Sequence, residues 1–254
     1  MTLLAGDIKT LEKSICNKCA GVVALNSSYC NHCGARQFGA NVNSSENNWR
    51  LLKQAALFYA IDILICCFCK FVDAFETLSW FVLLDVLAAI TTVIFFAFNW
   101  TENKALMVWR NFSWQKVSAY AAIAVAASVL VHYSVGWLNV VIYSKDEHYF
   151  EYAKGNLLGV VFVIFFTAVM PALFEELGYR GYLLQALLKV AGPEQAVYIS
   201  AFLFAIIHMS FISLFWLIPF ALFLGFVRIK EGTLWYGILI HFCFNLTACM
   251  FELL

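Results

Sequence analysis

Two adjacent glutamates and an arginine form the first group of side chains that could do chemistry. Glu175 and Glu176 follow an apolar run, and Arg180 comes four residues after Glu176. Residues four apart share a helical face, so Glu176 and Arg180 can form an ion pair. Glu175 points about 100° away from Glu176. Neighbouring carboxylates in a low dielectric repel each other, so this pattern predicts one paired carboxylate and one that could act as a general base.

Two histidines and an asparagine lie in later apolar stretches. His208 follows Phe204 by four residues, and His241 and Asn245 are four apart and share one helical face. A lone histidine in an apolar helix is usually a hydrogen-bonded core residue, but separate polar clusters in one half of a chain indicate a site. A rise of 1.5 Å per residue places Glu175, His208 and His241 roughly 22, 20 and 12 Å below one surface. The side chains could therefore meet inside a membrane.

Two chemistries suit these groups. A carboxylate and an imidazole can take a proton from water, while an imidazole N–H and a neutral amide can donate to an oxyanion. The same side chains could instead hold a second Zn²⁺ with an open position: Glu175, Glu176, His208, His241 and Asn245. The chain has no His-Glu-x-x-His string. The glutamate–water chemistry is therefore favoured, and the metal site is kept as the alternative.

Four cysteines near the amino terminus have the spacing of a metal site. Cys16-x-x-Cys19 and Cys30-x-x-Cys33 are separated by ten residues, and two such pairs on short turns can close a tetrahedral zinc site. We predict a zinc ribbon at residues 1–38, in which a structural Zn²⁺ supplies the folding energy that so short a chain lacks. The ribbon is expected to be structural or to bind a protein partner.

The elements that must position the later groups are strongly apolar. Of 254 residues, 63% are hydrophobic and 13% are charged, and the mean hydropathy is +0.80. Soluble domains contain about 45–50% apolar residues, so the composition excludes soluble globular and disordered proteins. The formal net charge is zero, so no nucleic-acid partner is expected. The partner that this composition predicts is the lipid bilayer.

Apolar runs of spanning length predict an all-α polytopic membrane domain at residues 49–254, after a flexible linker at 39–48. The runs are Leu51–Val72, Leu78–Asn99, Ser118–Leu138, Leu157–Phe174, Ala196–Ile229 and Leu234–Phe251. The fifth run would form two helices if it breaks near His208–Ser213, which gives about seven transmembrane helices, with six or eight as alternatives. Residues 155–190 are too many for one simple span, and Pro171 is expected to kink them.

Charges near the ends of these runs predict the orientation. Eight basic residues fall on the side of the amino terminus: Arg50, Lys53, Lys104, Arg110, Lys116, Lys189, Arg228 and Lys230. The positive-inside rule therefore predicts a cytoplasmic amino terminus, and the first fifteen residues hold no apolar signal segment. The ribbon and the compact size favour the cell membrane of a bacterium or an archaeon.

Two aspartates lie inside the first two spans. Asp62 and Asp85 are each expected to face the bundle and to bond to a neighbouring helix, because neither belongs to a recognisable cluster. They are therefore not assigned to the site.

Three strings carry a resemblance to a known family. FEELGYRG, FAIIH and HFCFN match, in order, the motifs Glu-Glu-x-x-x-Arg, Phe-x-x-x-His and His-x-x-x-Asn/Asp. They resemble the CPBP family of CAAX prenyl proteases and bacteriocin-processing intramembrane proteases, over about residues 155–250. The resemblance implies an intramembrane endopeptidase that cleaves a membrane-associated peptide or protein. Gly178 stands where the family commonly has a bulky apolar residue, which concerns the local substrate contact and not the charged groups.

The resemblance also implies a set of catalytic residues: Glu175, Glu176, Arg180, His208, His241 and Asn245. Glu175 and His208 would activate a water for attack on a peptide carbonyl. His241 and Asn245 would stabilise the oxyanion, and the remaining two would hold Glu175 in place.

Two other functional classes stay open. A protein of the same fold could be a non-proteolytic binding or regulatory protein, with the ribbon as its docking arm. A proton-coupled transporter could use Asp62, Asp85 and Glu175 as a relay, but the sequence has no inverted repeat. The peptidase is therefore favoured.

Overall fold

The computed structural model describes residues 13–16, 18–24, 29–30, 32–35, 37, 45–75, 77–109, 112–143 and 155–253. It begins with a short antiparallel hairpin, β1 (Lys13–Ile15) and β2 (Val22–Ala24), in which Ser14 lies opposite Val23. All longer elements among the described residues are helices. The predicted class, an all-α membrane protein with a small cysteine module in front, is confirmed.

Six helical segments of the described chain are long and apolar enough to cross a membrane: α1 (Ser45–Phe71), α2 (Leu78–Phe98), α4 (Trp114–Tyr143), the run Leu157–Leu187, α9 (Phe211–Glu231) and α10 (Trp235–Leu253). A further apolar helix, α8 (Pro193–Ile206), has only 14 residues. It is about 21 Å long, short of the roughly 30 Å of a hydrocarbon core. The expected break near His208–Ser213 is thus present, and it divides a short helix from a full span.

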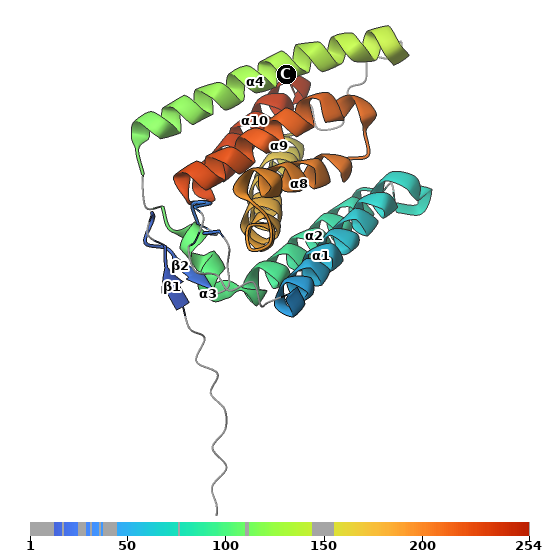
Figure 1. Ribbon diagram of the computed structural model, residues 1–254. Helices are drawn as coiled ribbons and strands as arrows, with labels where there is room; N and C mark the ends of the chain where they lie inside the picture. The colour runs from blue at the N-terminus through green and yellow to red at the C-terminus, as the bar shows by residue number, and fades with distance from the viewer. Residues whose placement is uncertain are drawn as a thin grey trace, which may run out of the picture.

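Short elements join these helices. Helix α1 begins inside the stretch 39–48 that was expected to be linker. The short helices η1 (Asp73–Phe75), α3 (Trp100–Asn103) and η2 (Lys104–Met107) follow α1 and α2. Helices α1 and α2 lie side by side, α4 runs along α10, and α8 and α9 form a pair between them (Figure 1). The hairpin lies near α3, away from the carboxyl terminus.

The run Leu157–Leu187 is one helical segment with two π-helical stretches. It consists of α5 (Leu157–Ile164), the π stretch η4 (Phe165–Val169), α6 (Met170–Glu175), the π stretch η5 (Glu176–Leu183) and α7 (Leu184–Leu187). The first π stretch ends at Val169, two residues before Pro171, which has no N–H to donate to the carbonyl of Thr167. The side-chain amide of Asn245 donates to that carbonyl instead, with a separation of 3.0 Å. The irregularity expected at Pro171 is therefore a local π stretch braced by α10.

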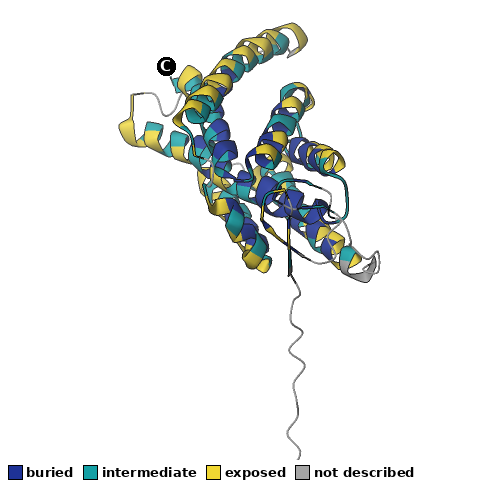
Figure 2. Cartoon of the chain, turned by 60° about the vertical axis from the view of Figure 1, so that its left-hand side comes forward, coloured by how far each residue is buried: buried dark blue, intermediate teal, exposed yellow. Residues whose placement is uncertain are grey.

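Burial follows the pattern of a membrane protein. The outward sides of the helices carry exposed apolar side chains, such as Leu130 at 68% and Leu158 at 79% exposure (Figure 2). The fully buried side chains include Arg180 and Arg228. Apolar residues outside and charged residues inside suit a lipid solvent. The interior charges therefore define where the site must lie.

Candidate active site

A cavity of about 450 Å³ opens beside Glu175. Helices α1, α2 and α6, the π stretch η5 and the turn between α8 and α9 line it. Its ionisable lining residues are Asp62, Cys66, Cys69, Lys70, Asp85, Glu175, Tyr179 and His208. Glu175 and His208, which were predicted from two separate motifs, therefore share one cavity.

The glutamate–arginine pair is present and fully buried. Arg180 donates from an Nη atom to Glu176 Oε1 at 2.9 Å, and the two side chains are 1% and 0% exposed. The guanidinium also lies over the ring of Phe204, 4.3 Å from its centroid, and donates to the carbonyl of Ala221 at 3.3 Å. The Arg180 side chain therefore connects η5 with α8 and α9.

His241 lies between the two glutamates. Its Nδ1 is 3.1 Å from Glu176 Oε1, and its Nε2 is 3.8 Å from Glu175 Oε2. Because a carboxylate only accepts, the Nδ1–H donates to Glu176, and Nε2 faces Glu175. Glu175 Oε2 has no hydrogen-bond partner among the described residues, although the Glu175 side chain is 29% exposed. A carboxylate oxygen of Glu175 without a partner therefore lies next to the cavity.

A glycine makes this arrangement possible. A methyl group added at Gly237 in α10 would lie 2.9 Å from Glu176 Oε2, which is closer than van der Waals contact. The absence of a side chain at Gly237 lets α10 approach η5 closely enough for His241 to reach Glu176.

The second histidine has a defined tautomer. His208 Nδ1 lies 2.9 Å from the carbonyl oxygen of Phe204, and a carbonyl only accepts. Nδ1 therefore carries the proton, and Nε2 of a neutral His208 is a base. His208 lines the cavity, and the free lone pair of its ring is on Nε2.

The last residue of the predicted set is placed differently from the others. Asn245 donates to the carbonyl of Thr167 and is not among the cavity-lining residues. Glu176 and Arg180 are connected to Glu175 through His241, because Arg180 pairs with Glu176 and Glu176 Oε1 faces His241 Nδ1. Of the predicted residues, Glu175 and His208 line the cavity. Glu176, Arg180 and His241 lie behind Glu175 in a chain of short contacts, and Asn245 lies at the π stretch.

Two aspartates of the cavity were not assigned to the site from the sequence. Asp62 does bond to a neighbouring helix, as expected, because Tyr179 Oη donates to its Oδ2 at 2.6 Å. Asp85 lines the same cavity and its Oδ2 has no partner among the described residues. A charged residue in the middle of a span is itself a signal of function. The sequence of α1 and α2, however, contains no pattern that shows that they pack beside Glu175.

The departure at Gly178 has a packing reason. A methyl group there would lie 2.9 Å from Phe58 Cζ in α1 and 3.2 Å from Thr92 Oγ1 in α2. Gly178 therefore lets α1 and α2 pack directly on η5. A bulky residue at this position would push apart two walls of the cavity.

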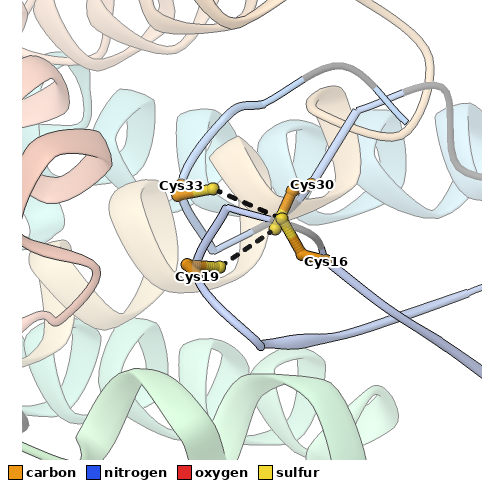
Figure 3. A group of neighbouring side chains, drawn as sticks. All are labelled: Cys16, Cys19, Cys30 and Cys33. Carbon is orange, nitrogen blue, oxygen red and sulfur yellow. Dashed lines mark hydrogen bonds between the residues drawn. The ribbon is translucent and has the colours of Figure 1, made fainter. Parts of the chain in front are cut away.

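The four amino-terminal cysteines form a group that fits a metal ion. All four Sγ atoms lie within 4.8 Å of one another, with 3.7 Å between Cys16 and Cys33 and 3.5 Å between Cys19 and Cys30 (Figure 3). A tetrahedral zinc site with Zn–S bonds of about 2.3 Å has sulfur pairs about 3.8 Å apart. His32 is not needed, because its ring bonds to the carbonyl of Val22. No second group of three or more such ligands is found among the described residues.

The surroundings of the sulfur atoms agree with metal binding. The backbone N–H groups of Lys18 and His32 donate to the Sγ atoms of Cys16 and Cys30. Burial raises the pKa of Cys33 to about 11 and that of Cys30 still further. Burial also opposes ionisation of Cys16, but backbone N–H donors lower its pKa to about 6. The thiols of Cys30 and Cys33 therefore need a cation nearby to become thiolates.

Metal content tests this centre. The purified protein is expected to hold about one zinc per chain, because one tetrahedral shell needs four thiolates. The double substitution Cys30→Ser and Cys33→Ser should remove it, whereas Cys67→Ser and Cys69→Ser should not. Two metals in the wild type, with one that survives the loss of Cys30 and Cys33, would instead favour a metal in the membrane site.

Comparison with known proteins agrees with this geometry. Residues 157–247 match the family model described as type II CAAX prenyl endopeptidase Rce1-like. No curated protein and no solved structure matches the chain. The matched residues include both glutamates, Arg180, both site histidines and Asn245. The expected CPBP resemblance is confirmed over this segment: residues 157–247 are similar to the Rce1-like family of CAAX protease-like intramembrane endopeptidases.

Proposed function

We propose that this protein hydrolyses a peptide bond in the membrane with a water activated by Glu175. The observation that carries the proposal is the position of the Glu175 carboxylate. It borders the cavity, has an oxygen without a partner among the described residues, and lies 3.8 Å from His241 Nε2. A water that contacts both groups would lie where a substrate carbonyl can reach it from the cavity.

The reaction assigns one task to each group. Glu175, assisted by the basic Nε2 of His208, takes a proton from the water while the water oxygen bonds to the carbonyl carbon. The same proton then passes to the leaving amine as the C–N bond breaks. In its doubly protonated state, His241 keeps Nδ1–H on Glu176 and offers Nε2–H to the oxyanion. The amide hydrogen of Asn245 that is not used on Thr167 is the candidate second donor.

Glu176 and Arg180 act through His241. Their ion pair fixes the position of Oε1, which accepts from His241 Nδ1. The ring is thereby oriented with Nε2 toward Glu175. We therefore regard these two as positioning residues and the other four predicted residues as candidates for contact with the substrate or the water.

The substrate is inferred to be a membrane-associated peptide or protein. Much of the cavity wall is apolar and is formed by Phe81, Leu84 and Ala88 of α2 and by Phe174. Such a wall accepts an extended apolar segment more readily than a charged one. The positive-inside rule supports a cytoplasmic position for the ribbon and the start of α1.

Comparison of protein termini in membranes tests the function. Cells that carry the wild type should contain cleaved termini that are absent with Glu175→Gln, because loss of a general base lowers a rate by about 10²–10⁴-fold. Glu194→Gln is the matched control, since Glu194 is exposed at the start of α8. Identical termini in all three strains, with equal protein abundance, would instead favour a non-proteolytic binding protein.

A further inference from the structure

The ribbon is docked on the membrane domain through its second cysteine pair. A methyl group added at Gly34 would lie 3.0 Å from Pro193, the first residue of α8, and 3.2 Å from Ile229 in the last turn of α9. A methyl group at Gly232, directly after α9, would lie 3.6 Å from the carbonyl oxygen of His32. His32 and Gly34, which flank Cys33, therefore lie on the ends of the two helices that flank His208.

A buried arginine connects this turn with the helix of the glutamate pair. Arg228 is 0% exposed, although its position in the last turn of α9 predicted a surface cation. Its Nε donates to the backbone carbonyl of Arg180 at 3.2 Å, and an Nη atom donates to Gln185 Oε1. Both acceptors belong to the run Leu157–Leu187. On the other side, Cys30 and Cys33 lie within electrostatic range of the guanidinium.

Charge balance explains why a cation lies there. Four thiolates around one Zn²⁺ leave two negative charges on the site. A guanidinium is always protonated, and its planar fork can serve several acceptors at once. Burying such a cation is favourable only next to compensating charge and hydrogen-bond acceptors. A metal-loaded ribbon supplies the charge, and the carbonyl of Arg180 and the amide of Gln185 supply the acceptors.

We propose that Arg228 is a positioning residue that couples metal loading of the ribbon to the helix carrying Glu175 and Glu176. The zinc thiolates of Cys30 and Cys33 hold the guanidinium, and the guanidinium holds the backbone at Arg180, whose side chain pairs with Glu176. The ribbon is thus a built-in brace of the membrane site. The link to catalysis rests on the proposed function, but the link to metal binding does not.

Zinc retention tests the coupling without any measurement of proteolysis. The full-length protein in detergent is mixed with a chromogenic chelator, and the rate of zinc loss is followed. Because Arg228→Gln removes the cation that stabilises the thiolate shell, it should lose zinc roughly 5- to 150-fold faster than the wild type, the range typical of coupled sites. Lys230→Gln is the control, since Lys230 is exposed in the same helical turn. Zinc loss at the wild-type rate in Arg228→Gln would overturn the proposal.

The conservative variant separates coupling from simple packing. Arg228→Lys keeps the charge that faces the thiolates but lacks the fork that serves two acceptors. It should lose zinc at close to the wild-type rate, while its rate of peptide cleavage falls. A purely structural role would not change one rate without the other. If Arg228→Lys loses zinc faster and cleaves more slowly by the same factor, the proposed role of Arg228 is contradicted. Absence of cleavage in the wild type would refute only the proposed function.

Wild-type protein provides a second test in case Arg228→Gln does not fold. Removal of zinc by the chelator should lower the midpoint of thermal unfolding of the membrane domain, because the brace on α7 and α9 is lost. An unchanged midpoint would show that ribbon and membrane domain are independent and would overturn the proposal.

Discussion

Arg180→Ala is expected to destabilise the protein by roughly 3–5 kcal/mol, because it leaves the buried Glu176 carboxylate without its cation. Glu176 is 0% exposed and its Oε1 accepts from Arg180 at 2.9 Å. The same substitution removes the cation–π contact with Phe204 and the hydrogen bond to Ala221.

Unfolding in detergent at constant protein concentration measures this effect. Arg50→Ala is the matched control, since Arg50 is exposed near the start of α1, and it should change stability by little. Arg180→Ala should cost less in a Glu176→Gln background, where no carboxylate is stranded. The same cost in both backgrounds would mean that the ion pair contributes nothing and that Arg180 stabilises only through packing.

Local sequence spacing was sufficient for the parts of the site that lie within one segment. The two Cys-x-x-Cys pairs predicted the sulfur cluster, since each pair closes its own short turn. The spacing of Glu176 and Arg180 predicted their ion pair, which forms even though η5 is π-helical. The break near His208 was predicted because the apolar run was too long for one span. In each case the interacting residues are close along the chain.

Contacts between distant segments could not be read in the same way. Arg228 had the sequence context of a loop cation, but docking of the ribbon buries it. Asp62 meets Tyr179 only because Gly178 lets α1 reach η5. No periodic pattern within α1 or α9 encodes these partners. The sequence shows these charged residues, but it does not show which helix would bind each of them.

Asn245 shows how a motif residue can have a second role. Pro171 deprives the carbonyl of Thr167 of its usual donor four residues later, and the Asn245 amide donates to that carbonyl. Asn245→Ala should therefore destabilise the protein by about 1–3 kcal/mol, the cost of an unsatisfied buried polar group. Thr247→Ala is the control on the same helix, because Thr247 bonds only within α10, to the carbonyl of Cys243.

A double-mutant cycle with Pro171→Ala separates the two roles of Asn245. Alanine at position 171 restores an N–H that can donate to Thr167, so Asn245→Ala should cost less stability in this background. Equal costs in both backgrounds would show that Asn245 does not brace the π stretch. If Asn245 also donates to the oxyanion, the double variant should regain stability but cleave about 10²–10³-fold more slowly than Pro171→Ala alone. If bracing is its only role, cleavage should return together with stability, and His241 would be the remaining oxyanion donor of the predicted pair.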